Sequence, residues 1–154
     1  MGLDMYLDAK RSLYNKDWNE CESDKIAYRQ IREMFPEMHN SGNLNYISVS
    51  FEAGYWRKAS AIHKWFVDNV QDGEDNCSTN WVDREQLEEL RDTCKDVLAK
   101  HARKDELLPT ADGFFFGGTD YDEWYFNSLE QTVDILAKCL ALPEVWDFYY
   151  KSSW

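Results

Sequence analysis

Residues 54–66 read GYWRKASAIHKWF, and the organisation of the whole chain follows from this stretch. The pattern is typical of the end of a strand, a turn and the first turns of an amphipathic helix. Aromatic rings, two adjacent cations, a hydroxyl and an imidazole fall within these few residues. A second aromatic and glycine-rich stretch, Gly113–Phe126, is its natural counterpart further along the chain. We therefore expect the two stretches to converge on one solvent-accessible cavity.

Two strands and an undecided region precede this stretch. Residues 2–10 alternate between apolar and polar side chains, as do residues 44–53, and each alternation predicts a half-buried strand. Gly54 is expected to end the second strand. Residues 11–44 are either a lid or insertion or a long connection. They contain a predicted helix over 23–34, which Pro36 ends because the residue before a proline avoids helical angles.

Helical spacing and turn residues predict the rest of the fold. The elements are a helix over 57–70, a helix over 84–103, a short strand or hairpin arm at 114–116, a helix over 122–141 and a strand over 145–150. Asp83 with Gln86 is close to a capping box, and Asp120 or Asp122 is expected to cap the last long helix. The pattern favours a single α+β domain over 1–154, with a small antiparallel or mixed sheet and about three main helices packed on one face.

The net charge of the chain is −12, from 29 acidic and 17 basic residues. Such a field repels phosphate backbones and disfavours sequence-independent nucleic-acid binding, but it is compatible with a local basic site for one small anion. Aromatic residues make up 16% of the chain. Some of these rings must lie at the surface or in a cleft, because Trp and Tyr need a partner for their polar end. A homo-oligomer with the ligand at its interface would also accommodate them.

No disulfide, metal or membrane segment is predicted. The four cysteines, at positions 21, 77, 94 and 139, form no C-x-x-C pair, and no signal peptide is recognised, which indicates a reducing cytoplasm. The histidines at 39, 63 and 101 show no zinc spacing, so we expect neither a metal nor another cofactor. No apolar run approaches the ~20 residues that span a bilayer.

Two clusters of side chains have the composition of a ligand site. The first consists of Tyr55, Trp56, Arg57, Lys58, Ser60 and His63. Its cations lie at the beginning of a helix, where free backbone N–H groups also attract anions, and its rings could stack on a planar base. The second is the stretch Gly117–Trp124, of which Gly117, Asp120 and Tyr121 are the candidate ligand-binding residues. Glycine there lets a ligand approach the backbone, and acidic groups favour hydroxyls, amines or a cation. The structural alternatives are core rings beside a charged helix, and a helix cap with its turn.

Four segments resemble those of small proteins encoded in tailed-bacteriophage genomes. They are MGLDMYL at 1–7, YWRKASAIHKWF at 55–66, DNC at 75–77 and LLPTADGFFFGGTDYDEWYF at 107–126. The resemblance implies a protein made in the cytoplasm of an infected bacterium, and it assigns no functional residue. Accessory phage proteins of this size often counter host defence, either by sequestering nucleotide signals or by blocking a host protein, which is an analogy with that class.

Three functional hypotheses follow. The leading one is a non-enzymatic phage accessory protein that binds a small nucleotide-derived ligand, such as a host defence signal. In it, Tyr55 and Trp56 stack, Arg57 and Lys58 meet phosphate, and Gly117, Asp120 and Tyr121 close the pocket. The alternative is an acidic protein-interaction module that inhibits a host nucleic-acid-binding protein. The third, a hydrolase using His63 with Asp120 or Asp122, requires these groups within hydrogen-bond reach of one pocket.

Overall fold

The computed structural model describes residues 2–16, 20–37, 46–100, 103–113 and 119–154. The chain divides into two compact units, one of residues 1–9 with 51–154 and one of residues 10–50, and each is described by itself. The α+β class predicted from the sequence is confirmed, with an antiparallel sheet. The undecided region, 11–44, falls within the smaller unit.

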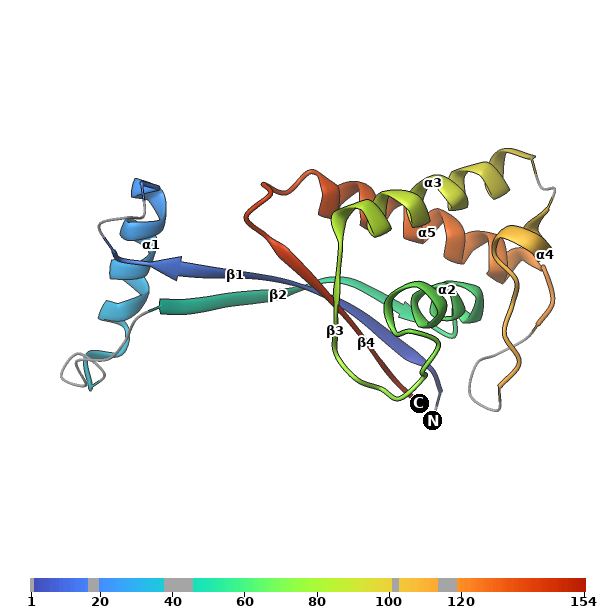
Figure 1. Cartoon of the computed structure of the whole chain (residues 1–154), viewed down its shortest axis with the longest axis horizontal. Helices are drawn as coiled ribbons and strands as arrows, with labels where there is room; N and C mark the ends of the chain where they lie inside the picture. Colours follow the sequence, from blue (N-terminus) through green and yellow to red (C-terminus); the bar gives the residue numbers. More distant parts are fainter. Residues whose placement is uncertain (1, 17–19, 38–45, 101–102, 114–118) are drawn as a thin grey trace. The chain divides into compact units, whose positions relative to one another are not determined.

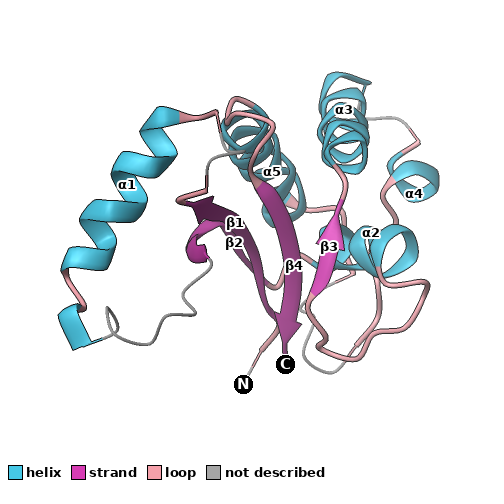
Figure 2. Ribbon diagram, turned by 60° about the vertical axis from the view of Figure 1, so that its left-hand side comes forward, coloured by secondary structure: helices cyan, strands magenta, loops and turns pink. Residues whose placement is uncertain are grey.

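The sheet of the larger unit has the strand order β2-β1-β4-β3 (Figure 2). Its strands are β1 (Asp4–Tyr14), β2 (Tyr46–Arg57), β3 (Asn80–Val82) and β4 (Asp147–Ser153). Residues 4–9 of β1 and 51–57 of β2 belong to the larger unit, and the remaining residues of both strands belong to the smaller unit. β3 pairs with β4 so that Trp81 lies opposite Tyr149. β3 was not predicted from the sequence, because three residues are too few to establish an alternation.

Three long helices of the larger unit pack on this sheet. They are α2 (Ser60–Val70), α3 (Arg84–Lys100) and α5 (Glu123–Leu140), and α3 and α5 run side by side (Figure 1). One further turn, α4 (Lys104–Leu107), was not predicted. The strand predicted at 114–116 lies outside the described residues.

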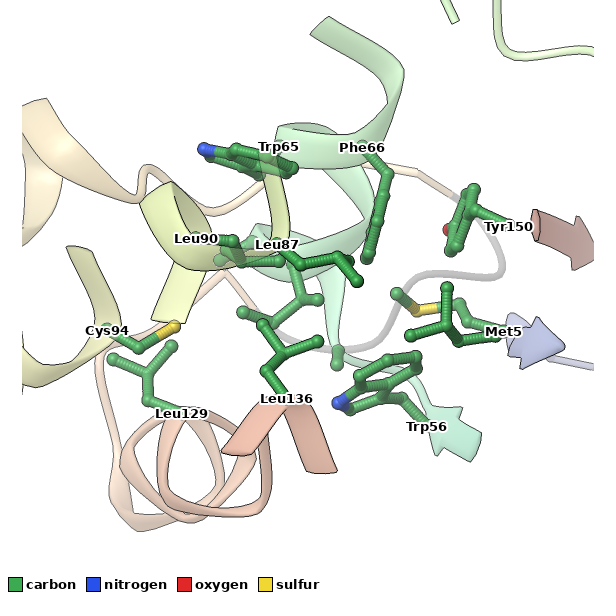
Figure 3. Packing of buried hydrophobic residues seen from close by; sticks show 14 of the residues in the cluster. Met5, Trp56, Trp65, Phe66, Leu87, Leu90, Cys94, Leu129, Leu136 and Tyr150 are labelled. Atoms are coloured by element: carbon green, nitrogen blue, oxygen red, sulfur yellow. The ribbon is translucent and has the colours of Figure 1, made fainter. Parts of the chain in front are cut away.

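One hydrophobic core joins the sheet to these helices (Figure 3). The odd-numbered residues 3–9 have no exposed surface, as expected for the inward face of the alternation. The Phe66 ring of α2 stacks on the Tyr150 ring of β4, with the ring centroids 3.9 Å apart. Fully burying a side chain such as Leu or Phe contributes ~1.5–3 kcal/mol. Contacts within this core therefore hold β1, β2 and β4 against α2.

Gly54 does not end β2, contrary to the sequence prediction, and the strand continues to Arg57. Because Gly54 has no side chain, helix α5 can pack closely against β2 at this position. A Cβ atom placed on Gly54 would lie 2.6 Å from Cγ2 of Ile135, closer than two carbon atoms can pack. A glycine inside a strand can thus mark a close approach of another element rather than a turn. Because β2 is longer than predicted, α2 begins later, at Ser60.

Both predicted caps are present. The Asp83 N–H donates to Oε1 of Gln86 at 2.9 Å, and Oδ1 of Asp83 accepts from the N–H of Glu85 at 2.9 Å, so Asp83 caps α3. At α5 the cap is Asp122, whose Oδ1 accepts from the N–H of Tyr125 at 3.0 Å. These bonds set where both helices begin, within one residue of the predictions.

The smaller unit contains α1 (Glu22–Glu33), which confirms the helix predicted over 23–34. Tyr28 of this helix is buried, and Asp24 pairs with Arg11 of β1. The rings of Tyr14 and Tyr46 lie with centroids 5.8 Å apart, one from each strand. The unit is therefore built from residues 10–14 of β1, residues 46–50 of β2 and α1.

Among the helices that the structure describes, none combines the length and the apolar character that crossing a membrane requires.

We expect Gly54→Ala to destabilise the protein, because its methyl group would collide with Ile135. Overpacking of this kind lowers the free energy of unfolding by ~1–3 kcal/mol, which urea denaturation can measure. Ile135→Ala opens space at the same contact, so the double variant should lose less stability than the two single variants together. Strictly additive losses would contradict the close packing of Gly54 against α5.

Candidate functional site

A cavity of about 360 Å³ lies between the beginning of α2 and the beginning of α5. We call it the α2–α5 cavity. Its described lining is Lys58, Ala59, Ser60, Ala61, Thr110, Asp120, Asp122, Trp124, Tyr125 and Ser128. The stretches 54–66 and 113–126, which the sequence analysis singled out, both contribute to it. Of the nine candidate residues, Lys58, Ser60 and Asp120 line this cavity.

The beginning of α2 presents backbone donors to the cavity. The N-cap residue is Ala59, which makes no side-chain cap, and the first turn contains no acidic residue. Lys58 has φ 54°, a left-handed conformation at the turn from β2 into α2, and its N–H donates to the carbonyl of Leu3 at 2.8 Å. The first N–H groups of a helix lack intrahelical acceptors and carry partial positive charge. These N–H groups and the Lys58 side chain are the positively charged groups on the α2 side of the cavity.

The Ser60 hydroxyl lies in this cavity without a hydrogen-bond partner in the described part of the chain. Only 5% of the Ser60 surface is exposed, and the residue is open on the side that lines the cavity. The hydroxyl is therefore available to a molecule that enters the cavity.

The α5 side of the cavity has a different chemistry. Asp120 and Asp122 supply carboxylates there, and the Asp122 carboxylate already accepts the cap bond from Tyr125. Trp124 follows in the first turn of α5 and is 59% exposed. The hydroxyl of Thr110 donates to the carbonyl of Thr119 at 2.9 Å. This side can accept hydrogen bonds from hydroxyls or amines and can stack on a planar ring.

Trp56 and Tyr55 lie away from the cavity. Trp56 has no exposed surface and belongs to the core, where its indole N–H donates to Oγ1 of Thr132 at 2.9 Å (Figure 3). Tyr55 donates its hydroxyl to Asp4, and this hydrogen bond raises the pKa of the Tyr55 phenol. Neighbouring strand residues point to opposite faces of a sheet, and neither Tyr55 nor Trp56 is among the residues that line the cavity.

Two further candidates lie beside the cavity. Tyr121 packs edge-on against Tyr125, with ring centroids 4.9 Å apart, and thereby supports a residue of the lining. Arg57 lines a second, smaller cavity of about 120 Å³ together with Trp124, Asn127, Ser128 and Gln131. Gly117 lies outside the described residues.

His63 lies in the core, with 1% of its surface exposed. Its Nδ1 lies 2.7 Å from the hydroxyl of Tyr150, and its Nε2 lies 2.9 Å from Oδ2 of Asp75. Both ring nitrogens are thus engaged by groups other than Asp120 and Asp122. The arrangement gives no support to the hydrolase hypothesis, which requires His63 beside one of those two carboxylates.

Burial raises the pKa of the Tyr150 phenol well above its ordinary value, and the nearby Asp75 carboxylate raises it further, against a smaller lowering by the Ser152 side chain. Tyr150 therefore keeps its proton and shares a hydrogen bond with Nδ1 of His63. The network of Tyr150, His63 and Asp75 ties α2, β4 and the loop after α2 together.

The described residues hold no cluster of three or more His, Cys, Asp or Glu side chains with the geometry to bind a metal ion. Two cysteines are buried, and burial raises the pKa of the Cys94 thiol to about 12 and that of Cys139 to about 11. A protonated thiol is a poor nucleophile. These two cysteines therefore act as core residues.

Several lining residues are absent from the nine candidates, although one of them, Trp124, belongs to the candidate stretch Gly117–Trp124. Trp124 and Ser128 are four residues apart in α5 and so share one helix face, together with Gln131. This spacing was readable in the sequence. Thr110 carried no comparable signal, because a loop residue shows no periodicity.

Neither a protein-family model, nor a curated protein, nor a solved structure matches this chain.

We expect Tyr150→Phe to lower the free energy of unfolding by ~1–3 kcal/mol, because it leaves the buried Nδ1 of His63 without its hydrogen-bond partner. Tyr149→Phe is the matched control, since Tyr149 is the adjacent residue on the opposite face of β4 and only half-buried. Urea denaturation of both variants provides the comparison. Equal losses of stability would contradict a stabilising hydrogen bond between Tyr150 and His63.

We expect iodoacetamide at about pH 8 to alkylate the exposed thiols and spare those whose pKa is raised, because the thiolate is the reactive form. The exposed residues are Cys21 and Cys77, and the buried ones are Cys94 and Cys139. The intact mass should show two adducts for the native protein and four after denaturation. Rapid alkylation of Cys94 in the native protein would contradict its burial.

Proposed function

We propose that the protein binds a small nucleotide-derived ligand in the α2–α5 cavity, without transforming it. A single arrangement carries the proposal. The uncapped beginning of α2, with Lys58 and the unpartnered Ser60 hydroxyl, shares one cavity with the exposed ring of Trp124. Anion donors and a stacking platform within one concave site are the two features that a nucleotide requires.

The phosphate of the ligand belongs at α2. Backbone N–H groups at a helix beginning bind phosphate through both their hydrogen bonds and the helix dipole. Lys58 adds a full positive charge, and Ser60 adds a hydroxyl donor. Asp120 and Asp122, on the α5 side, would repel a phosphate placed against them and so orient the ligand.

The base and sugar belong on the α5 side. Trp124 offers an indole face, and base–aromatic stacking contributes ~1–3 kcal/mol per base. Asp120 can accept hydrogen bonds from ribose hydroxyls or from an exocyclic amine. A cavity of about 360 Å³ lies within the range of roughly 300–1,000 Å³ typical of small-molecule sites. Ring, acceptors and volume all suit a nucleotide.

The resemblance to small tailed-phage proteins suggests where such binding would matter. An accessory protein made in an infected bacterium could hold a host nucleotide signal and lower its free concentration. Sequestration needs affinity and abundance but no turnover. This role agrees with His63 being committed to Asp75 and Tyr150 in the core.

Calorimetry with adenosine and guanosine monophosphates tests the proposal, and we expect heat of binding with a raised melting temperature. Lys58→Asn removes the charge, and asparagine tolerates the left-handed conformation of this position. It should weaken binding by about tenfold to a hundredfold, the value of one charge-assisted hydrogen bond. Ser60→Ala should weaken binding as well.

Lys138→Asn is the matched control, because Lys138 lies in the last turn of α5 and pairs with Asp134. It makes the same charge change and should leave the affinity unaltered. Loss of binding in both lysine variants would indicate a general electrostatic effect. No binding of any nucleotide to the unaltered protein would reject the proposal.

A second candidate function rests on the distribution of charge. Residues 10–50 contain six acidic and six basic residues, so the whole net charge of −12 belongs to residues 1–9 and 51–154. An acidic unit of this kind could occupy the basic groove of a host nucleic-acid-binding protein. Capture of a basic host protein that is lost at high salt, with no nucleotide binding, would favour this function over the first.

A further inference from the structure

The hydroxyl groups on the α5 side of the α2–α5 cavity have already used their protons. They belong to Thr110, Tyr125 and Ser128. Each donates to a backbone carbonyl, and these acceptors are, in the same order, Thr119 at 2.9 Å, Leu108 at 3.0 Å and Tyr125 at 2.7 Å. A hydroxyl has a single proton and two lone pairs. Toward a ligand these three groups can therefore only accept hydrogen bonds.

The two carboxylates on this side are acceptors as well, and they differ in what they have left. Oδ1 of Asp122 already accepts the cap bond from the N–H of Tyr125 at 3.0 Å. Asp120 is exposed, and within the described part of the chain no hydrogen bond or ion pair engages its side chain. An ionised carboxylate has two oxygens and no donor. Both oxygens of Asp120 can therefore accept from one ligand at once.

The indole N–H of Trp124 is the remaining side-chain donor among the described residues that line the α5 side. It points along the plane of the ring, whereas a base stacks on the ring face. A base stacked on Trp124 therefore meets the ring rather than this N–H. The donors Lys58 and Ser60 lie on the α2 side. The cavity thus sets side-chain donors at α2 against side-chain acceptors at α5.

The nucleobases differ in the donors that they can offer to such an acceptor. Guanine carries an N1–H beside its N2 amino group, and two parallel N–H groups match the two oxygens of a carboxylate as an arginine does. Adenine and cytosine place an acceptor nitrogen beside their amino group. That nitrogen would face a carboxylate oxygen with no proton between them, which leaves two acceptors unpaired.

We infer that the ligand of this cavity is a guanine nucleotide, whose base stacks on Trp124 and donates from N1–H and the N2 amino group to Asp120. The inference rests on the proposed function and specifies the base of its ligand. Asp120 is then a specificity-determining residue, while the phosphate remains on the side of Lys58 and Ser60.

Calorimetry with the monophosphates of guanosine, inosine, xanthosine and adenosine tests the inference. Inosine differs from guanosine only in lacking the N2 amino group. It should bind about tenfold to a hundredfold more weakly, the value of one charge-assisted hydrogen bond. Xanthosine presents a carbonyl oxygen in place of that amino group, and adenosine an acceptor at N1. Both should bind at least as weakly as inosine.

Asp120→Asn is the informative variant, because asparagine keeps one acceptor oxygen and replaces the other with an NH₂ donor. The new donor matches the C2 carbonyl of xanthosine and opposes the amino group of guanosine. We expect the ratio of guanosine to xanthosine affinity to fall at least tenfold. If Asp120 acted only by repelling phosphate or by stabilising its loop, both nucleotides would change alike and the ratio would stay constant.

Asp134→Asn is the matched control, because Asp134 is an exposed residue of α5 that pairs with Lys138 and lines neither cavity. It makes the same charge change and should leave the ratio unaltered. Circular dichroism melting checks that each variant is folded.

The outcomes separate the inference from the proposed function. Adenosine or inosine binding as tightly as guanosine, or a ratio that Asp120→Asn does not alter, would overturn the guanine inference and leave the proposed function standing. A change of ratio in Asp122→Asn but not in Asp120→Asn would overturn the assignment to Asp120. An absence of binding by all four nucleotides would reject the proposed function, and the inference with it.

Discussion

The docking of α5 on the last residues of β2 is the contact on which the candidate site depends. Residues 54–56 of β2 each meet one residue of the helix. Gly54 has no side chain, which leaves room for Ile135. The carbonyl of Tyr55 accepts a hydrogen bond from Gln131, and the indole N–H of Trp56 donates one to Thr132. Steric fit and two hydrogen bonds thus fix the position of the helix along the strand and its rotation about its own axis.

The same face of α5 then builds the site. Trp124, Ser128, Gln131 and Ile135 follow one another at intervals of four, three and four residues, which is the spacing of a single helix face. The C-terminal half of this face rests on β2, and its N-terminal half lines both cavities. Because a helix is stiff, a contact at Ile135 determines where Trp124 lies relative to the beginning of α2. The packing of α5 on β2 therefore contributes to the core and also positions the residues that line the cavities.

Local signals in the sequence predicted most of the elements. Asp83 with Gln86 and Asp122 marked helix beginnings, since caps act within a few residues. The structural role of Gly54 could not be predicted from its neighbours in the sequence. A glycine that ends a strand and a glycine against which a helix packs give the same local signal, and only the folded structure shows the contact with Ile135. The same holds for the candidate site: Lys58 and Ser60 could be identified because they lie at the beginning of a helix. The partners of His63 came instead from a loop and a distant strand.

The acidity of the larger unit and the donors at the beginning of α2 act at different ranges. Surface charges are screened over about 8 Å at physiological salt, so a long polyanion meets the acidic field over much of its length. A small ligand inside the cavity would meet groups of both kinds at contact distance, because Lys58, Ser60 and the beginning of α2 share the cavity with Asp120 and Asp122. Under the proposed function, the phosphate of such a ligand would lie on the Lys58 side, since the two carboxylates repel it from the α5 side. The net charge of −12 would then disfavour a nucleic-acid polymer more than a small ligand, because only the polymer extends along the acidic surface.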